Sequence, residues 1–133
     1  MAATGLAAPA SAAPAIQITS VHYDSPGPDT RSNASLNGEW VKIKNTSRKA
    51  RALTDWTLLD RSGHLYVFGR FTLKPGKSVT VHTGRGSNTA THRYWGYRAY
   101  VWNNTGDEAL LFNRNGGRVD SCAWGRGSGL VYC

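Results

Sequence analysis

The sequence predicts an all-β domain folded as an antiparallel β-sandwich of about seven to nine short strands. Composition is the first reason: Trp, Tyr, Val and Thr are frequent, and 15 glycines are spread among them, which favours strands over helices. Periodicity is the second, because no window of about ten residues keeps a helical apolar spacing free of Gly or Pro. Short alternating segments recurring about every ten residues are the third.

The first expected strand covers residues 15–24, with Ile16 and Ile18 on one face and Val21 on the other. Residues 25–38 follow as a polar loop, because they are rich in Pro, Asn and Ser. No strand is expected in that loop.

The cleanest alternation lies in residues 39–45, where Val41 and Ile43 are expected to face the core. Residues 55–60 and 65–68 are two further apolar segments separated by a short turn that contains glycine. This arrangement predicts a hairpin.

Pro75 and Gly76 are the residues preferred at the centre of a tight turn, and a strand is expected next, over residues 79–82. The following segment, 85–104, shows little alternation but holds several aromatic residues. Loops this long in compact domains are functional or disordered, and the aromatics argue against disorder. We therefore expect a functional loop.

The last two expected strands follow a turn at residues 104–107. Residues 108–113 form one strand, with Leu110 and Phe112 expected to enter the core. A second glycine turn leads into the other strand, residues 119–124.

The charge balance is strongly basic. Sixteen Lys and Arg oppose eight Asp and Glu, which gives a formal net charge of +8. Most of the cations are Arg, whose planar fork of donors suits phosphates and carboxylates, so an anionic partner is favoured. The alternative is that the charge only keeps the protein soluble.

The ends of the chain point to export. Residues 1–15 are mostly small and uncharged and resemble the remnant of a secretory signal, which leaves residues 16–133 as one domain. Cys122 and Cys133 are the only cysteines, and in an oxidising compartment they are expected to form a disulfide that clips the C-terminal tail. No run approaches the roughly 20 apolar residues of a membrane span. We predict a secreted protein without membrane insertion.

Four linked segments resemble one family in order and spacing. They read LNGEWVKIKNTS, LTDWTLLDRSGHLYVF, FTLKPGKSVTVHTGRGSNTATHRYWG and VWNNTGDEALLFNRNGGRVDS. Residues 16–124 as a whole resemble the bacterial lamin-tail domain. The resemblance implies an immunoglobulin-like antiparallel β-sandwich, and family members are commonly exported, alone or joined to enzymes. The family carries no established catalytic residues. The Cys122 to Cys133 tail is an addition to the family pattern.

Catalytic motifs are missing from the sequence. The four histidines fall in separate segments, and no nucleophile elbow or zinc-binding spacing is present. A hydrolase needs a nucleophile or metal supported by a second group. We therefore expect no enzyme and no cofactor. The histidines are His22, His64, His82 and His92.

Calcium binding is an alternative for the polar loop. Asp24, Asp29 and Glu39 offer the oxygen ligands that calcium takes. Arg31 lies among them, however, and the spacing of a known calcium loop is not met. Asp and Asn also favour turns by bonding their own backbone, so a purely structural role explains them equally.

A basic-aromatic set of residues within segment 85–104 is the binding-site hypothesis. Its rings and cations could stack bases, hold sugars or form a protein hot spot. Trp95 and Trp102 are expected to cover the end of the sandwich, because large aromatics are mostly buried. Arg93, Arg98 and Tyr100 are expected to be exposed. The predicted binding residues are Arg85, His92, Arg93, Tyr94, Tyr97, Arg98 and Tyr100.

A second basic patch lies on strand 39–45 and the connection after it. It is either a solvated face, in which lysines guard an edge strand from pairing, or a nucleic-acid surface. Its residues are Lys42, Lys44, Arg48, Lys49 and Arg51.

These observations together predict a non-catalytic, secreted binding or assembly module. The expected partner is a protein or an anionic cell-envelope polymer, recognised through the basic-aromatic set. Two alternatives stay open: nonspecific binding of nucleic acid through its phosphates, and a role as accessory subunit of a secreted enzyme or toxin complex.

Overall fold

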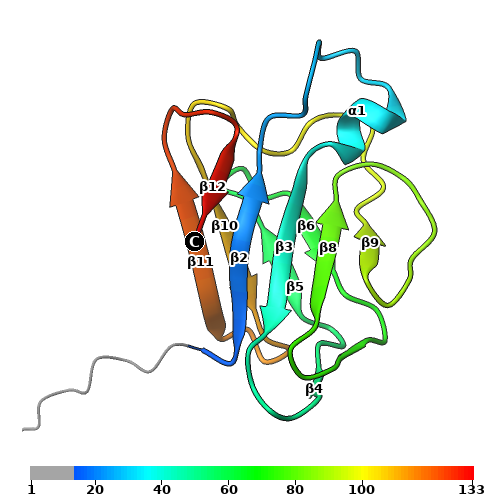
Figure 1. Cartoon of the computed structure of the whole chain (residues 1–133), viewed down its shortest axis with the longest axis vertical. Coiled ribbons are helices and arrows are strands. Elements are labelled where there is room, and N and C mark those ends of the chain that lie inside the picture. The colour runs from blue at the N-terminus through cyan, green and yellow to red at the C-terminus, as the bar shows by residue number, and fades with distance from the viewer. Residues whose placement is uncertain (1–13) are drawn as a thin grey trace, which may run out of the picture.

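The computed structural model describes residues 14–133, in which two large β-sheets face each other as an immunoglobulin-like sandwich (Figure 1). The five-stranded sheet has the order β12-β2-β3-β8-β9, the four-stranded sheet β11-β10-β5-β6, and β4 pairs with β7. The strands are β2 (Ile16–His22), β3 (Trp40–Asn45), β4 (Arg51–Ala52), β5 (Thr57–Leu59), β6 (Leu65–Val67), β7 (Thr72–Leu73), β8 (Ser78–His82), β9 (His92–Tyr94), β10 (Asp107–Phe112), β11 (Arg118–Trp124) and β12 (Leu130–Tyr132).

The predicted fold class is confirmed, but the described chain holds more strands than expected. The additional ones, such as β4 and β7, have two or three residues, too few to show an alternating pattern. One pairing also departs from the antiparallel rule, because β9 runs parallel to β8. The polar loop 25–38 contains a short helix, α1 (Asn33–Asn37), that the sequence analysis missed.

The helix is explained by its cap rather than by an apolar stripe. Ser32 accepts a hydrogen bond from the Ser35 N–H with its side chain, which satisfies one of the free donors of the first turn. Leu36 is the buried residue of α1. A single turn with one buried residue leaves no periodicity to detect in a sequence.

The core fills the space between the two sheets. Val41 and Ile43 of β3 are fully buried, as predicted, and they face Leu58 of β5 and Leu111 of β10 across the sandwich interior. β3 lies between β2 and β8. Its lysines are therefore not guards of an edge strand. Lys42 and Lys44 are exposed on the outer face of the sheet, so both a solvated face and a nucleic-acid surface remain compatible with the second basic patch.

Two predictions of the inward face were wrong. Ala109 and Leu111 are the fully buried residues of β10, and Leu110 and Phe112 are only half-buried. Asp107, at the start of the strand, points inward and accepts hydrogen bonds from backbone N–H groups. Because side chains alternate along a strand, Ala109 and Leu111 then face inward as well.

In β2 the predicted alternation fails for a different reason. The register shifts between Ile18 and Ser20, and this bulge turns Val21 inward so that it is buried like Ile18. A bulge inserts one extra residue and reverses the faces beyond it.

The predicted disulfide between Cys122 and Cys133 is present, with the two Cα atoms 5.7 Å apart. Cys122 belongs to β11 of the four-stranded sheet. Cys133 directly follows β12, which pairs with β2 in the other sheet. The bond therefore links the two sheets as well as holding the tail.

One end of the sandwich depends on Asn45, the last residue of β3. Asn45 is completely buried, and its Nδ2 donates to the carbonyls of Lys49 and Leu73 at 2.8 and 2.9 Å. Its backbone N–H donates to the Lys77 carbonyl, and its carbonyl accepts from the Gly76 N–H. Asn45 thus joins the connection after β3 to the turn before β8. We call this end the basic end, because it gathers Lys44, Arg48, Lys49, Arg51, Lys74 and Lys77.

Replacing Asn45 by Ala is expected to lower the free energy of unfolding by about 3 kcal/mol, because buried carbonyls lose their donors. Urea denaturation measures this loss, and Asn104→Ala serves as the control, since Asn104 is exposed. A loss below about 1 kcal/mol would show that Asn45 does not hold the basic end together.

Candidate functional site

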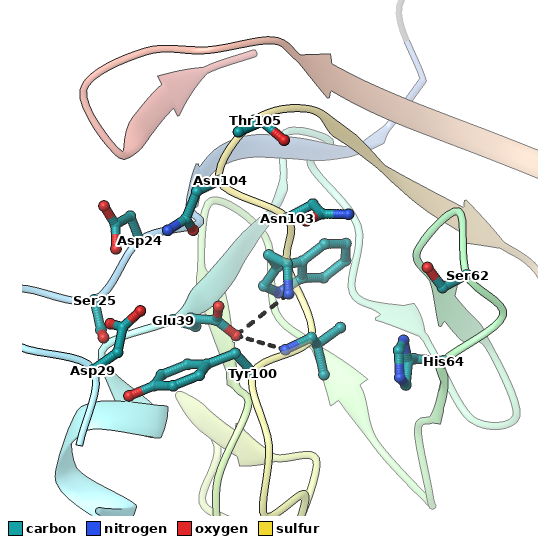
Figure 2. Close-up of a pocket in the computed structure, with 12 residues that line it drawn as sticks. Asp24, Ser25, Asp29, Glu39, Ser62, His64, Tyr100, Asn103, Asn104 and Thr105 are labelled. Atoms are coloured by element: carbon teal, nitrogen blue, oxygen red, sulfur yellow. Dashed lines mark hydrogen bonds between the residues drawn. The ribbon is translucent and has the colours of Figure 1, made fainter. Parts of the chain in front are cut away.

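The opposite end of the sandwich, which carries α1, forms a hollow of two adjoining pockets. We call it the loop end. The larger pocket, of about 360 Å³, is the acidic pocket, and the smaller one, of about 300 Å³, is the arginine pocket. The two share His64 and Tyr100. The acidic pocket is lined by Asp24, Ser25, Asp29, Glu39, Ser62, His64, Tyr100, Val101, Trp102, Asn103, Asn104 and Thr105 (Figure 2).

Glu39 is the anchor of this hollow. The residue directly precedes β3, and only 1% of it is exposed. Its Oε1 accepts hydrogen bonds from the N–H groups of Val101 and Trp102, at 2.9 and 3.4 Å (Figure 2). The same oxygen accepts from the Thr83 hydroxyl at 2.9 Å. One carboxyl group therefore fastens the start of β3, the end of β8 and the segment before β10 to one another.

Burial raises the pKa of the Glu39 carboxyl to about 7. The nearby charge of Asp29 acts in the same direction, and the hydrogen bonds from Val101, Thr83 and Trp102 oppose it without cancelling it. Near neutral pH the carboxyl is thus divided between its protonated and ionised forms.

Two other buried carboxylates shape the turn between β5 and β6. Asp60 accepts from the N–H groups of Ser62 and His64, and the His64 imidazole pairs with its second oxygen. Asp107 accepts from the N–H of Arg61 at 3.0 Å and from that of Asn103 at 3.1 Å. These bonds bring Ser62, His64 and Asn103 to the rim of the acidic pocket.

The predicted basic-aromatic set does not form one surface. Tyr97, Arg98 and Tyr100 line the arginine pocket. The other members lie elsewhere: His92, Arg93 and Tyr94 form β9 at the edge of the five-stranded sheet, and Arg85 lies in the loop before it. Arg98 is exposed, as expected. Tyr100 is half-buried instead, because its hydroxyl binds Ser35 Oγ at 2.6 Å and accepts from the Arg31 N–H at 3.1 Å.

Arg93 is also not freely exposed, contrary to the sequence analysis. Its guanidinium carbon lies 4.3 Å from the centre of the Phe71 ring, and its Nε is buried without an acceptor among residues 14–133. The stacking of a guanidinium on an aromatic face explains the placement. The Arg93 side chain therefore takes part in packing within the domain.

The remaining members of the set bind neighbouring protein groups. His92 Nδ1 lies 2.9 Å from His82 Nε2, and Tyr94 stacks on the His82 ring. The backbone of Arg85 is hydrogen-bonded by the side chains of Asn33 and Asn37. The sequence analysis treated His82 and His92 as separate, because only the parallel pairing of β8 with β9 brings them together.

The two tryptophans behave largely as predicted. Trp102 is 3% exposed and meets Trp95 and Trp124 edge to face, with ring centres 5.7 Å apart in both pairs. Trp95 is half-buried and packs against the core. Both rings therefore cover the end of the sandwich rather than offer a free surface.

The three carboxylates considered for calcium do come together, since all of them line the acidic pocket. In the described part of the chain, however, no three His, Cys, Asp or Glu side chains are placed to hold one metal ion. The amide residues that also line the pocket, Asn103 and Asn104, end segment 85–104, and Asn104 begins the predicted turn, but neither was among the predicted binding residues. No pattern marks them as pocket residues, because the fold alone brings the turn over Glu39.

The raised pKa of Glu39 predicts how the free energy of unfolding depends on pH. The folded protein holds this proton more tightly than the unfolded chain, so stability falls as pH rises from 4.5 to about 7. Glu39→Gln removes the effect, so between pH 5 and pH 8 we expect the free energy of unfolding of the wild type to fall by about 2.5 kcal/mol relative to that of Glu39→Gln.

Urea denaturation at the two pH values checks this, with Asp55→Asn as the control because Asp55 is exposed and does not contribute to the pKa shift of Glu39. Parallel pH profiles of the wild type and Glu39→Gln would contradict the placement of the proton on Glu39.

Comparison with known proteins relates most of the chain to a protein family. The model of a family described as Lamin Tail Domain matches residues 9–126. The match begins before residue 16, where the sequence analysis placed the start of the domain. The expected leader covers residues 1–15, and residues 1–13 of it lie outside the described residues. No curated protein matches the chain. In residues 14–133 no helix is long and apolar enough to cross a bilayer.

Proposed function

The chain belongs to the lamin-tail domain family, and from this premise we propose that it is a non-catalytic module that binds a protein partner at its loop end. The family provides an immunoglobulin-like scaffold for binding. In such scaffolds, loops held by a rigid sandwich carry the recognition residues. The loop end has this construction, since Glu39 fixes segment 97–105 to the strands below it.

The observation that supports this proposal most is the open hollow of two joined pockets. The arginine pocket is lined by Tyr97, Arg98 and Tyr100, and Tyr and Arg are among the residues enriched in binding hot spots. Tyr97 packs against His64 and Trp95, and Tyr100 is tied to Ser35, so both rings are ordered before a partner arrives. Ordered rings lower the entropy lost on binding.

The charge of the hollow favours a protein over an anionic polymer at this end. Asp24, Asp29 and Glu39 share the hollow with a single arginine, Arg98. A chain of phosphates would meet these carboxylates and be repelled. A protein surface can present cations to them and acceptors to Arg98.

The basic end supports a second candidate function, the binding of an anionic cell-envelope polymer or nucleic acid. It gathers six Lys and Arg around Asn45, and no Asp or Glu occurs between Asp60 and Asp107 in the sequence. In residues 14–133 none of these six cations is paired with a carboxylate. Such a surface binds polyanions with an affinity that falls steeply with salt.

We also infer that the module acts outside the cell. The disulfide between Cys122 and Cys133 supports this, because such bonds persist in oxidising compartments. An accessory subunit of a secreted enzyme or toxin complex would use the loop end in the same way.

Differential capture tests the binding site. The wild type is immobilised beside a loop-end variant, Arg98→Ala with Asn104→Ala, and a matched basic-end variant, Lys74→Ala with Lys77→Ala. All four side chains are exposed and make no hydrogen bond in the described structure. Tyr100→Ala is avoided because it would also cut the link to α1. From the native secretome, the wild type and the basic-end variant are expected to recover the same dominant protein, and the loop-end variant at least about tenfold less.

Equal recovery by the loop-end variant would contradict the proposed site. If only the basic-end variant loses binding, and the wild type binds about a hundredfold less when salt rises from about 50 to 200 mM, the second candidate function is correct instead.

A further inference from the structure

One edge of the sandwich presents apolar side chains to solvent. In the described part of the chain the exposed large hydrophobic residues are Leu65, Val67 and Tyr132, of which 45%, 49% and 80% is exposed. Leu65 and Val67 both belong to β6, the edge strand of the four-stranded sheet. Proteins normally cover or charge such strands, because another chain can pair with them. The uncovered apolar edge of β6 therefore calls for a partner.

The apolar surface continues from β6 across the outer face of the same sheet. Leu65 is paired with Leu59 of β5, and Leu59 is paired with Leu110 of β10. In the next row of the sheet, Phe112 lies two strands away from Val67. The three residues from β5 and β10 are half-buried. An apolar segment placed beside β6 would thus extend an existing apolar surface.

The backbone of β6 has hydrogen-bonding groups to offer on this side. The ladder with β5 uses the backbone groups of residues 64, 66 and 68, so those of Leu65 and Val67 face away from β5. The Leu65 carbonyl accepts from Trp95 Nε1 at 3.0 Å. Leu65 N–H and both backbone groups of Val67 have no partner among residues 14–133. We call this side of β6 the open edge.

The neighbouring edge strand, β9, is closed by comparison. β6 and β9 border the same side of the sandwich (Figure 1). The outward carbonyl of His92 accepts from the Thr89 N–H at 2.8 Å, and the Tyr94 N–H donates to Asn88 Oδ1 at 3.1 Å. A new strand could pair with β9 only by displacing this loop. On this side of the molecule the open edge of β6 is the place where a strand can be added.

A cation without an acceptor lies between the two edges. Arg93 of β9 is in register with the buried Val81, so its side chain points into the sandwich. It stacks on Phe71 and forms no hydrogen bond or ion pair through its guanidinium with residues 14–133. Burial raises the pKa of Tyr66 in β6, and the charge of Arg93 opposes this, so the guanidinium lies near the inner face of β6. A partly buried guanidinium without an acceptor is matched best by a carboxylate.

The other charges near the open edge also favour an acidic segment. Arg61 precedes β6 and pairs with Glu108 at 3.8 Å. Arg70 follows β6, and Arg98 lies in the adjoining arginine pocket. In the described structure neither of these two is paired with a carboxylate. Asp55, whose N–H binds the carbonyl of residue 68, is the exposed carboxylate nearby. Cations therefore outnumber carboxylates here, and this balance attracts acidic side chains.

We propose that the protein partner adds an extended, acidic-apolar segment to the open edge of β6 as an antiparallel strand. Side chains alternate along a strand, so two apolar residues of the segment lie beside Leu65 and Val67 on the outer face. The acidic residue between them points inward, to Arg93. Strand addition of this kind combines backbone hydrogen bonds with selection of alternate side chains.

The open edge is continuous with the loop end. β6 begins directly after His64, which lines both the acidic and the arginine pocket. The His64 ring also packs edge to face on Tyr97 of the arginine pocket. The inference therefore rests on the proposed function, because it names the form in which the partner is bound beside the loop end.

An NMR titration of the whole protein with the peptide N-acetyl-Thr-Val-Glu-Val-Thr-amide tests the proposal. We expect saturable shifts of the Leu65 and Val67 amides, and slower hydrogen exchange at both, because each N–H gains an acceptor. The same peptide with Lys in place of Glu is expected to bind at least about tenfold more weakly, since its charge meets Arg93.

Variants of the open edge locate the peptide. Val67→Pro removes an outward N–H and leaves the ladder with β5 intact, so it is expected to weaken peptide binding at least about tenfold. Leu65→Ser with Val67→Ser removes the apolar contact without a change of backbone, and we expect a similar loss. The matched control is Tyr132→Ser, which removes an exposed hydrophobic side chain from β12 and should leave binding unchanged.

Several results would overturn the proposal. Without saturable shifts at Leu65 and Val67, no strand is added to β6. Equal affinity for the Lys peptide would show that Arg93 does not select a carboxylate, and equal binding by the double serine variant would place the peptide elsewhere. In the capture experiment, the double serine variant distinguishes the two hypotheses. If it still recovers the partner while Arg98→Ala with Asn104→Ala does not, the proposed function stands and this inference fails.

Discussion

The loop end depends on one buried carboxyl group. Glu39 accepts from two backbone N–H groups and one hydroxyl, and these come from segments that are far apart in the sequence. Without these bonds, the backbone of Val101 and Trp102 would lose its link to the start of β3, and the segment would be held only by contacts such as those of Tyr100 with Ser35 and of Asn103 with Asp107. Burial disfavours the ionised form of the Glu39 carboxyl, and this is why its pKa is raised.

The central strand β3 organises both ends of the molecule. Glu39 precedes it and fixes the loop end, and Asn45 ends it and fixes the basic end. Both residues are buried and polar, and between them Val41 and Ile43 belong to the hydrophobic core. The carboxylates and most of the turn cations are thereby carried to opposite ends. One small domain thereby carries a pocket lined by carboxylates at one end and a group of Lys and Arg at the other.

Sequence patterns predicted the parts of the fold that depend on repetition or on composition. Strong alternation identified β3, glycine turns identified the hairpin of β5 and β6, and the two cysteines identified the disulfide. Patterns failed where one residue changes which side chains of a strand face inward, as at the bulge in β2 and at Asp107, the first residue of β10. They also failed for the site. Nothing local marks Glu39 as buried, since its partners Thr83 and Val101 are supplied by the fold, and the parallel strand β9 that pairs His92 with His82 is too short to recognise.

The most direct test of this account is a carbon-detected NMR titration of the Glu39 side-chain carboxyl in the whole protein. The account predicts a pKa of about 7, with the amide signals of Val101 and Trp102 shifting at the same pH, because they donate to the titrating group. A pKa near 4.5, the ordinary value for this carboxyl, with no matching shift of the two amides, would contradict it and remove the anchor on which the loop end rests.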